Sequence, residues 1–330
     1  MTLSDPVPTF WQRLQDLLKN KNIRRLMYGL IVLASAVFIA YAVYSNWNEF
    51  KTQQWDFNYY YIILAVLLYP AGMLPTVAAW HKLLQAMGVE CSFQTDLRLY
   101  SLSILPKHIP GFVMFVTSRS LLYQEEKVPA ATSVTATGAE TILLALTGFI
   151  SSILLLFLGV ERMGQFSVFR YAAPAAIILV IVFVFWTPAL NRLLQKILTR
   201  RGIQQVPQLN QKQTVFSLLW MFLAWAGGGL ILFALVQAVN PLNWSLLPVM
   251  IGTWGAAGAV SLTIGIGIQG LGIREITLGA LLSLVMPTLT AIVIAVAFRL
   301  VLTIGEVVWV LFFVWITKKP SAKLEGVSNE

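Results

Sequence analysis

Long apolar runs recur along almost the whole chain and constrain its fold more than any other feature. A helix crosses a bilayer with about 20 apolar residues. Runs of that length cover residues 26–45, 58–80, 128–158, 169–188, 214–238 and 288–316. Only 11% of the 330 residues are charged, against about 25% in soluble domains. Disorder is excluded because 58% of the chain is apolar, whereas disordered chains are poor in hydrophobic residues. The pattern predicts an all-α polytopic integral membrane protein.

The excess of basic residues indicates an orientation in the membrane and not a nucleic-acid partner. The net charge is +9, and Lys and Arg gather in short segments beside the apolar runs. Such segments stay on the cytoplasmic side of a bacterial-type inner membrane. Basic clusters precede the first run, follow the run at 169–188 and end the chain. We therefore expect both termini in the cytoplasm and no nucleic acid as partner.

Metal and cofactor chemistry finds no support in the residue types. The chain has one cysteine, Cys91, and two histidines, His81 and His108. A single cysteine cannot form an internal disulfide, and this set is too small for a structural zinc site. Motifs of hydrolases, metalloproteases and P-loop proteins are absent from the sequence. We expect no metal, no cofactor and no catalytic residue.

The stretch 93–123 does not fit as a simple span. The basic clusters place both ends of this stretch on the cytoplasmic side, so the chain has to enter and leave from there. Its middle contains the helix-interrupting residues Pro106, Pro110 and Gly111. We predict a re-entrant hairpin that enters the membrane from the cytoplasm.

Residues 246–287 begin and end outside by the same reasoning. They are interrupted by a glycine run, Gly265, Gly267, Gly270 and Gly272. Its first three members have the spacing of a dinucleotide fingerprint, but the βαβ context that the fingerprint needs is missing, so a broken, closely packed helix explains them better. We predict a second hairpin, from the outer face. The whole becomes an inverted-topology repeat of about six full spans and two opposed re-entrant hairpins.

The predicted domain organisation is simple. Residues 1–25 form a cytoplasmic segment with an interfacial amphipathic helix at 9–20, residues 26–317 form the transmembrane domain, and residues 318–330 form a cytoplasmic tail. Small-residue stretches such as Gly227–Gly229 permit close contacts in a homo-oligomer, and an enzyme of lipid biosynthesis is an alternative partner.

Charged residues inside the apolar segments are the candidate functional residues. They are Arg119, Glu140, Arg274, Glu275, Arg299 and Glu306, three of each sign. Each isolated charge at a helix centre costs about 2.5–3.5 kcal/mol, so we expect the six to face a shared interior. Glu140 and Arg299 occupy corresponding positions of the repeat, which predicts an ion pair between them.

Two interpretations of these charges stay open. The six form ion pairs that only specify helix packing, or at least one arginine has donors free to bind a phosphate. Arg119 and Arg274 lie closest to the hairpin interruptions, where backbone N–H groups assist anion binding. Lys107 and His108 are either interfacial residues or further substrate contacts.

Two ordered motifs resemble a known family. The first is Lys107-His-Ile-Pro110-Gly111, followed by Arg119 and then Glu140. The second is Gly270-Leu-Gly272-Ile-Arg274-Glu275, followed by Phe298-Arg299-Leu300. Together they resemble the transmembrane region of lysylphosphatidylglycerol synthases, over residues 25–316. One departure is Gly265-Ile-Gly267-Ile, where the family commonly has a proline before the glycine-rich turn.

The resemblance implies a flippase-like domain that moves an anionic phospholipid or lipid-linked headgroup between leaflets, with the six charges, Lys107 and His108 as its substrate-binding residues. Full-length synthases add a soluble aminoacyl-transferase domain. The chain ends soon after its last apolar run, so we expect neither that domain nor aminoacyl transfer.

Two alternatives are weaker. One is a membrane enzyme, or enzyme subunit, of lipid-linked glycan synthesis. The acidic residues predicted outside, Glu49, Asp56 and Glu161, are too widely spaced for a metal and sugar-nucleotide site. The other is a scaffold for a partner enzyme.

Overall fold

The protein is helical throughout its described parts. The computed structural model describes residues 56–104, 112–163, 187–200, 206–265 and 272–316, and no strand occurs in these ranges. Within them, five stretches are long and apolar enough to cross a membrane: Tyr59–Ala86, Ala130–Ile153, Gln211–Val239, Trp244–Ile264 and Thr288–Phe313. The all-α fold class and the multi-pass membrane architecture are thereby confirmed. The spans predicted at 26–45 and 169–188, the interfacial helix at 9–20 and the tail lie outside the described residues.

The predicted span at 58–80 consists of two helices, α4 (Tyr59–Leu67) and α5 (Tyr69–Ala86). The interruption falls at Leu68, two residues before Pro70, whose missing N–H is harmless in the first turn of a helix. Two prolines within the run 58–80, Pro70 and Pro75, predict two interruptions of this span. The second one is wrong, because α5 continues through Pro75. Membrane helices tolerate an internal proline where neighbouring elements surround the freed backbone groups.

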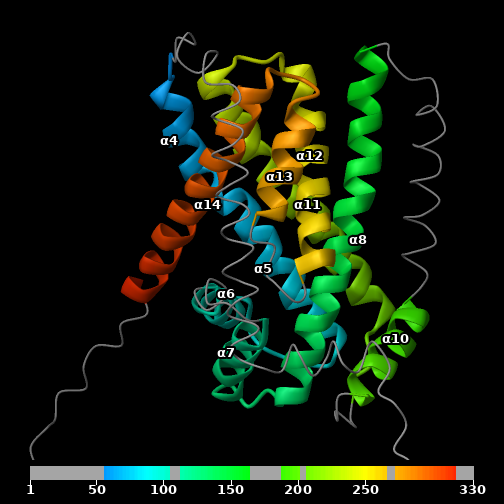
Figure 1. Cartoon of the computed structure of the whole chain (residues 1–330). Coiled ribbons are helices and arrows are strands. Elements are labelled where there is room, and N and C mark those ends of the chain that lie inside the picture. The colour runs from blue at the N-terminus through cyan, green and yellow to red at the C-terminus, as the bar shows by residue number, and fades with distance from the viewer. Residues whose placement is uncertain (1–55, 105–111, 164–186, 201–205, 266–271, 317–330) are drawn as a thin grey trace, which may run out of the picture.

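Helix α11 (Gln211–Val239) runs through the centre of the bundle and packs against α4, α5 and α12 (Leu247–Gly265). The short 3-10 helix η3 (Trp244–Leu246) precedes α12. Helix α8 (Ala130–Met163) packs along α12, and α10 (Thr187–Thr199) lies beside it at the lower end of Figure 1. Glycines allow α8 and α12 to approach closely: a side-chain carbon on Gly148 of α8 would lie 2.9 Å from the carbonyl oxygen of Gly255 on α12.

Each region predicted as a re-entrant hairpin contains a pair of helices (Figure 1). The first pair, α6 (Phe93–Leu102) and α7 (Phe112–Gln124), lies beside the lower end of α8. The second pair is α12 and α13 (Ile273–Leu282), of which α13 lies in the upper half, between α12 and α14 (Thr288–Ile316). The ten residues of α13 extend about 15 Å, half the hydrocarbon thickness. The nineteen residues of α12 extend about 28 Å, so this arm is long enough for a full span. That both pairs are re-entrant stays a prediction.

Gly272 is the N-cap residue of α13. Its φ of 84° lies in the left-handed region that residues with a Cβ rarely adopt. Its N–H donates to Oε2 of Glu275 at 3.1 Å, which satisfies one of the donors left unpaired at a helix start. The local geometry thus places the charged residues of the second motif at the beginning of α13.

Candidate functional site

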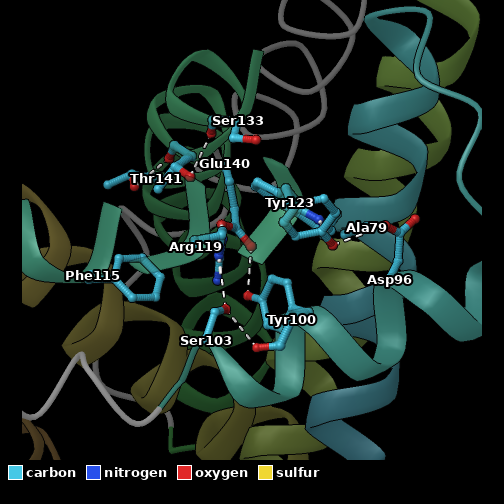
Figure 2. Close-up of polar contacts among 12 residues, drawn as sticks. Ala79, Asp96, Tyr100, Ser103, Phe115, Arg119, Tyr123, Ser133, Glu140 and Thr141 are labelled. Atoms are coloured by element: carbon cyan, nitrogen blue, oxygen red, sulfur yellow. Dashed lines mark hydrogen bonds and ion pairs between the residues drawn. The ribbon is translucent and has the colours of Figure 1, made fainter. Parts of the chain in front are cut away.

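The first motif forms a closed ion pair between α7 and α8. Nη1 of Arg119 lies 2.5 Å from Oε2 of Glu140, and its Nε donates to Oγ of Ser103 at 3.1 Å. The hydroxyl of Tyr100 donates to the other carboxylate oxygen of Glu140 at 2.7 Å. Figure 2 shows these side chains converging from α6, α7 and α8. Because Arg119 is only 1% exposed, this charge is held inside protein.

Three aromatic rings surround the same guanidinium. Cζ of Arg119 lies 4.4 Å from the ring centre of Trp80, 4.1 Å from that of Tyr100 and 4.4 Å from that of Phe115. The negative faces of aromatic rings attract a cation at such distances, most strongly when water is excluded. The rings and Glu140 together offset the cost of burying Arg119.

A second polar cluster adjoins these rings at the lower end of the bundle. Asp96 is completely buried and accepts from the hydroxyl of Tyr123 at 2.9 Å; its other oxygen lies 2.6 Å from Nδ1 of His81. Tyr123 in turn accepts from Nε1 of Trp80 at 2.7 Å. The cluster connects α5, α6 and α7 and fixes the ring of Trp80 against Arg119.

The second motif contains two arginines that share one carboxylate. Oε1 of Glu275 lies 3.3 Å from Nη2 of Arg274 and 3.2 Å from Nη1 of Arg299. Glu275 is buried, whereas the side chains of Arg274 and Arg299 are 29% and 40% exposed. This group therefore carries more positive than negative charge, and both guanidiniums are accessible.

A central cavity of about 300 Å³ lies between the two motifs. Arg119 borders it from the first motif, Arg274 from the second, and Glu306 from α14. Thr76 and Ser261 add hydroxyl groups, and most of the remaining wall is apolar, including Trp254, whose ring centre lies 5.6 Å from Cζ of Arg274. An apolar cavity with a few convergent polar groups is the usual form of a ligand site.

The family model for the lysylphosphatidylglycerol synthase TM region matches residues 27–309. The chain belongs to this family. The match covers α4 to α13 and most of α14, and it includes both motifs of the site. It identifies the chain with a membrane domain of flippase-like role. No curated protein was found to match the chain.

One predicted contact in this family member is wrong. Glu140 pairs with Arg119 and Arg299 pairs with Glu275, and the structure records no ion pair between Glu140 and Arg299. Equivalent positions in a repeat are related by symmetry, which does not bring them into contact. Each half instead neutralises its buried carboxylate with a nearby arginine of the same motif.

The single shared interior expected for all six charges is realised only in part. Arg119, Arg274 and Glu306 border the central cavity, but Glu140, Glu275 and Arg299 do not. Lys107, His108, Pro106, Pro110, Gly111, Gly267 and Gly270 lie outside the described residues. Of the predicted interruptions, Gly265 ends α12 and Gly272 precedes α13.

Several residues of the site were missed. Tyr100, Ser103 and Trp80 contact Arg119, and Asp96 supports the cluster behind them. Asp96 lies within the predicted hairpin at 93–123, and this acidic residue could have indicated the cluster from the sequence, because a buried carboxylate needs hydrogen-bond partners. Among the described residues, no group of three or more His, Cys, Asp or Glu side chains forms a metal-binding arrangement.

Proposed function

We propose that this protein is a lipid flippase that moves an anionic phospholipid, or another anionic lipid-linked headgroup, between the leaflets. The observation that carries the proposal is the central cavity, which brings charged residues of both motifs together inside a bundle of membrane-spanning helices. In this proposal the chain is a transporter, with no catalytic residue of its own, in a bacterial-type inner membrane with both termini in the cytoplasm.

Arg274 is the best candidate for the phosphate ligand in the cavity. Within the described part of the chain its ion-pair partner is Glu275, contacted through Nη2, which leaves further guanidinium donors for an anion. Guanidinium groups bind phosphate with two parallel hydrogen bonds, and the attraction is stronger in an apolar cavity than in water. Arg119 is engaged by Glu140, Ser103 and three rings, so we assign it to the wall of the cavity.

The size of the cavity supports transport of the headgroup alone. Its volume of about 300 Å³ is at the lower limit of common ligand sites. A phosphate with a small headgroup fits such a space, but two acyl chains do not. The chains would stay in the bilayer while the polar part of the lipid crosses within the protein.

A leaflet assay tests this function. Purified protein is reconstituted into vesicles containing a fluorescent phosphatidylglycerol, and a membrane-impermeant quencher reports the fraction of lipid in the outer leaflet. We expect transport above empty vesicles and about tenfold slower transport by Arg274→Gln, which removes a charged hydrogen bond. Arg192→Gln, at an exposed position on α10, is the matched control and should transport normally. Wild-type vesicles indistinguishable from empty ones under every imposed ion gradient would refute the proposal.

A further inference from the structure

A second cavity lies between α13 and α14, apart from the central one. Its volume is about 410 Å³. Small and apolar side chains form most of its wall: Ile276, Gly279, Ala280, Ile292, Ala295 and Val296. We call this cavity the α13–α14 groove.

The groove opens on a surface that lies at membrane depth. Ile276 and Ala280, on its α13 side, are exposed. Its α14 side belongs to the membrane-spanning stretch Thr288–Phe313, whose exposed residues include Leu300 and Ile304. The chemical surroundings of the groove at this depth are lipid acyl chains.

Charged residues of the second motif line the same groove. Arg299 and Glu275 both border it, and Arg299 is 40% exposed near the middle of its span. A partly exposed guanidinium at this depth is costly unless an anion accompanies it. Glu275 supplies only part of that compensation, because its Oε1 is shared with Arg274. Among the described residues, the ion-paired group of Arg274, Glu275 and Arg299 has two positive charges and one negative charge, which favours one further anion beside it.

An apolar groove that ends at an incompletely neutralised arginine has the chemistry of a phospholipid. The acyl chain matches the wall of Ile276, Ile292 and Val296, and the phosphodiester matches Arg299. Glu275 contacts both arginines, of which Arg299 borders the groove and Arg274 borders the central cavity. The two cavities are therefore linked through one carboxylate.

We propose that the α13–α14 groove binds one acyl chain of an anionic membrane phospholipid, with the lipid phosphate on Arg299. Resting on the flippase function proposed above, the groove is the lateral access route, and the headgroup passes from Arg299 to Arg274 as Glu275 exchanges its partners. Transport then begins with a lipid already selected for negative charge.

Photoreactive lipids test the groove directly in the wild-type chain. Vesicles of equal phosphatidylglycerol and phosphatidylcholine content receive one of the two lipids with a diazirine in its acyl chain, and labelled peptides are identified by mass spectrometry. We expect the phosphatidylglycerol probe to label Ile276 and Val296 about tenfold more than the phosphatidylcholine probe. Leu300 and Ile304 are exposed on α14 but do not line the groove, and both lipid probes should label them equally. Equal labelling within the groove, or none, would overturn the proposal.

Two variants identify the cause of the preference. Arg299→Gln should abolish the preference for phosphatidylglycerol, and Ala280→Phe should fill the groove and remove its labelling. Leu300→Phe, at an exposed position of α14 that does not line the groove, is the matched control. It should change neither the preference for phosphatidylglycerol nor the labelling of the groove. If Ala280→Phe fails to fold, Arg299→Gln still decides the question, since an unchanged preference contradicts the proposal.

The leaflet assay separates this proposal from the function on which it rests. Selective groove labelling in a wild-type protein without transport would refute the flippase function and leave the lipid site standing. Normal transport by a folded Ala280→Phe variant whose groove no longer labels would refute the access route and leave the flippase function standing.

Discussion

Nη1 of Arg119 on α7 lies 2.5 Å from Oε2 of Glu140 on α8, and both side chains are buried. The two residues come from successive helices of the first motif, and the pair joins these helices beside the central cavity. Ser103 accepts a hydrogen bond from Arg119, Tyr100 donates one to Glu140, and aromatic rings such as Trp80 contact the guanidinium, so both charged groups have polar or aromatic partners. The pair therefore holds the wall of the cavity in place.

Removing one member of this pair should destabilise the protein strongly. Glu140→Ala leaves a buried guanidinium without its counter-ion, and we expect a loss of about 3–5 kcal/mol in the free energy of unfolding. The double variant Arg119→Met/Glu140→Leu should recover most of that loss, because it buries no charge. Unfolding of the detergent-solubilised protein, followed by tryptophan fluorescence, measures both. A Glu140→Ala variant as stable as wild type would show that the pair lacks this structural role.

Glycines of α8 should differ in their tolerance of a methyl group. Gly148→Ala places a carbon 2.9 Å from Gly255 and from the ring of Trp225, and should cost about 1–3 kcal/mol by forcing α8 and α12 apart. Gly138, on the same helix, has no neighbour within 4 Å of the added carbon. Gly138→Ala should therefore be neutral, or stabilising by about 0.5–1 kcal/mol. Thermal unfolding of both variants provides the comparison, and equal effects would contradict the close α8–α12 contact.

Neutralising Glu275 should strengthen the binding of anionic lipid. Glu275→Gln removes the carboxylate that competes with a phosphate for Arg274 and Arg299. We expect a larger rise in melting temperature on adding phosphatidylglycerol than wild type shows, with no such gain for phosphatidylcholine. Without lipid, the variant should be less stable, because the N–H of Gly272 and both arginines lose a charged partner. An unchanged response to phosphatidylglycerol would indicate that these arginines do not bind the lipid.

Cys91 offers a test of orientation and of local electrostatics. It lies between α5 and α6, and burial, together with the nearby carboxylates of Asp96 and Glu126, raises the pKa of its thiol. At a pH below this pKa only a small fraction of the thiol is ionised, and the thiolate is the form that reacts with a maleimide. The rate of labelling should therefore rise about tenfold for each pH unit, as long as the pH stays below the pKa. An impermeant maleimide should label Cys91 only after the cells are permeabilised, because the loop is predicted to be cytoplasmic.

The control for orientation is a Trp244→Cys variant in a Cys91→Ser background. Trp244 is exposed and follows the C-terminal end of α11, whereas the residue before α11, Asn210, donates its N–H to Ala86 at the end of α5, close in sequence to Cys91. Trp244→Cys should therefore be labelled in intact cells. Reversed accessibility of the two positions would invert the predicted topology.

The pattern of apolar runs was sufficient to predict the helical membrane class and several of the spans. The runs at 128–158, 214–238 and 288–316 correspond to α8, α11 and α14, since about 20 apolar residues have few alternatives to a membrane helix. The interruption near Pro70 was also predictable, because proline cannot donate the backbone hydrogen bond of a helix interior and is favoured in the first turn of a new helix. Pro75 was not, since its effect depends on what packs around α5.

Pairing of the charges was the main failure of prediction. The count of three arginines and three glutamates indicated compensation, but Glu140 was paired with Arg299 on the strength of equivalent positions. Contacts depend on which helix faces which, and apolar periodicity is weak in helices that meet lipid or protein on every side. The aromatic cage of Arg119 was missed for the same reason, because Trp80 and Phe115 look like ordinary membrane residues in the sequence.

The amino-acid sequence by itself determined that this chain is a helical membrane protein, which family it resembles and which charges lie at membrane depth. Those properties follow from the cost of burying polar groups in lipid, a cost that acts on each segment separately. Only the tertiary structure decided that Arg119 is enclosed while Arg274 and Arg299 are accessible, and that Glu275 lies between a polar cavity and an apolar groove. Exposure and pairing depend on contacts between distant segments, which side-chain packing of the whole bundle establishes.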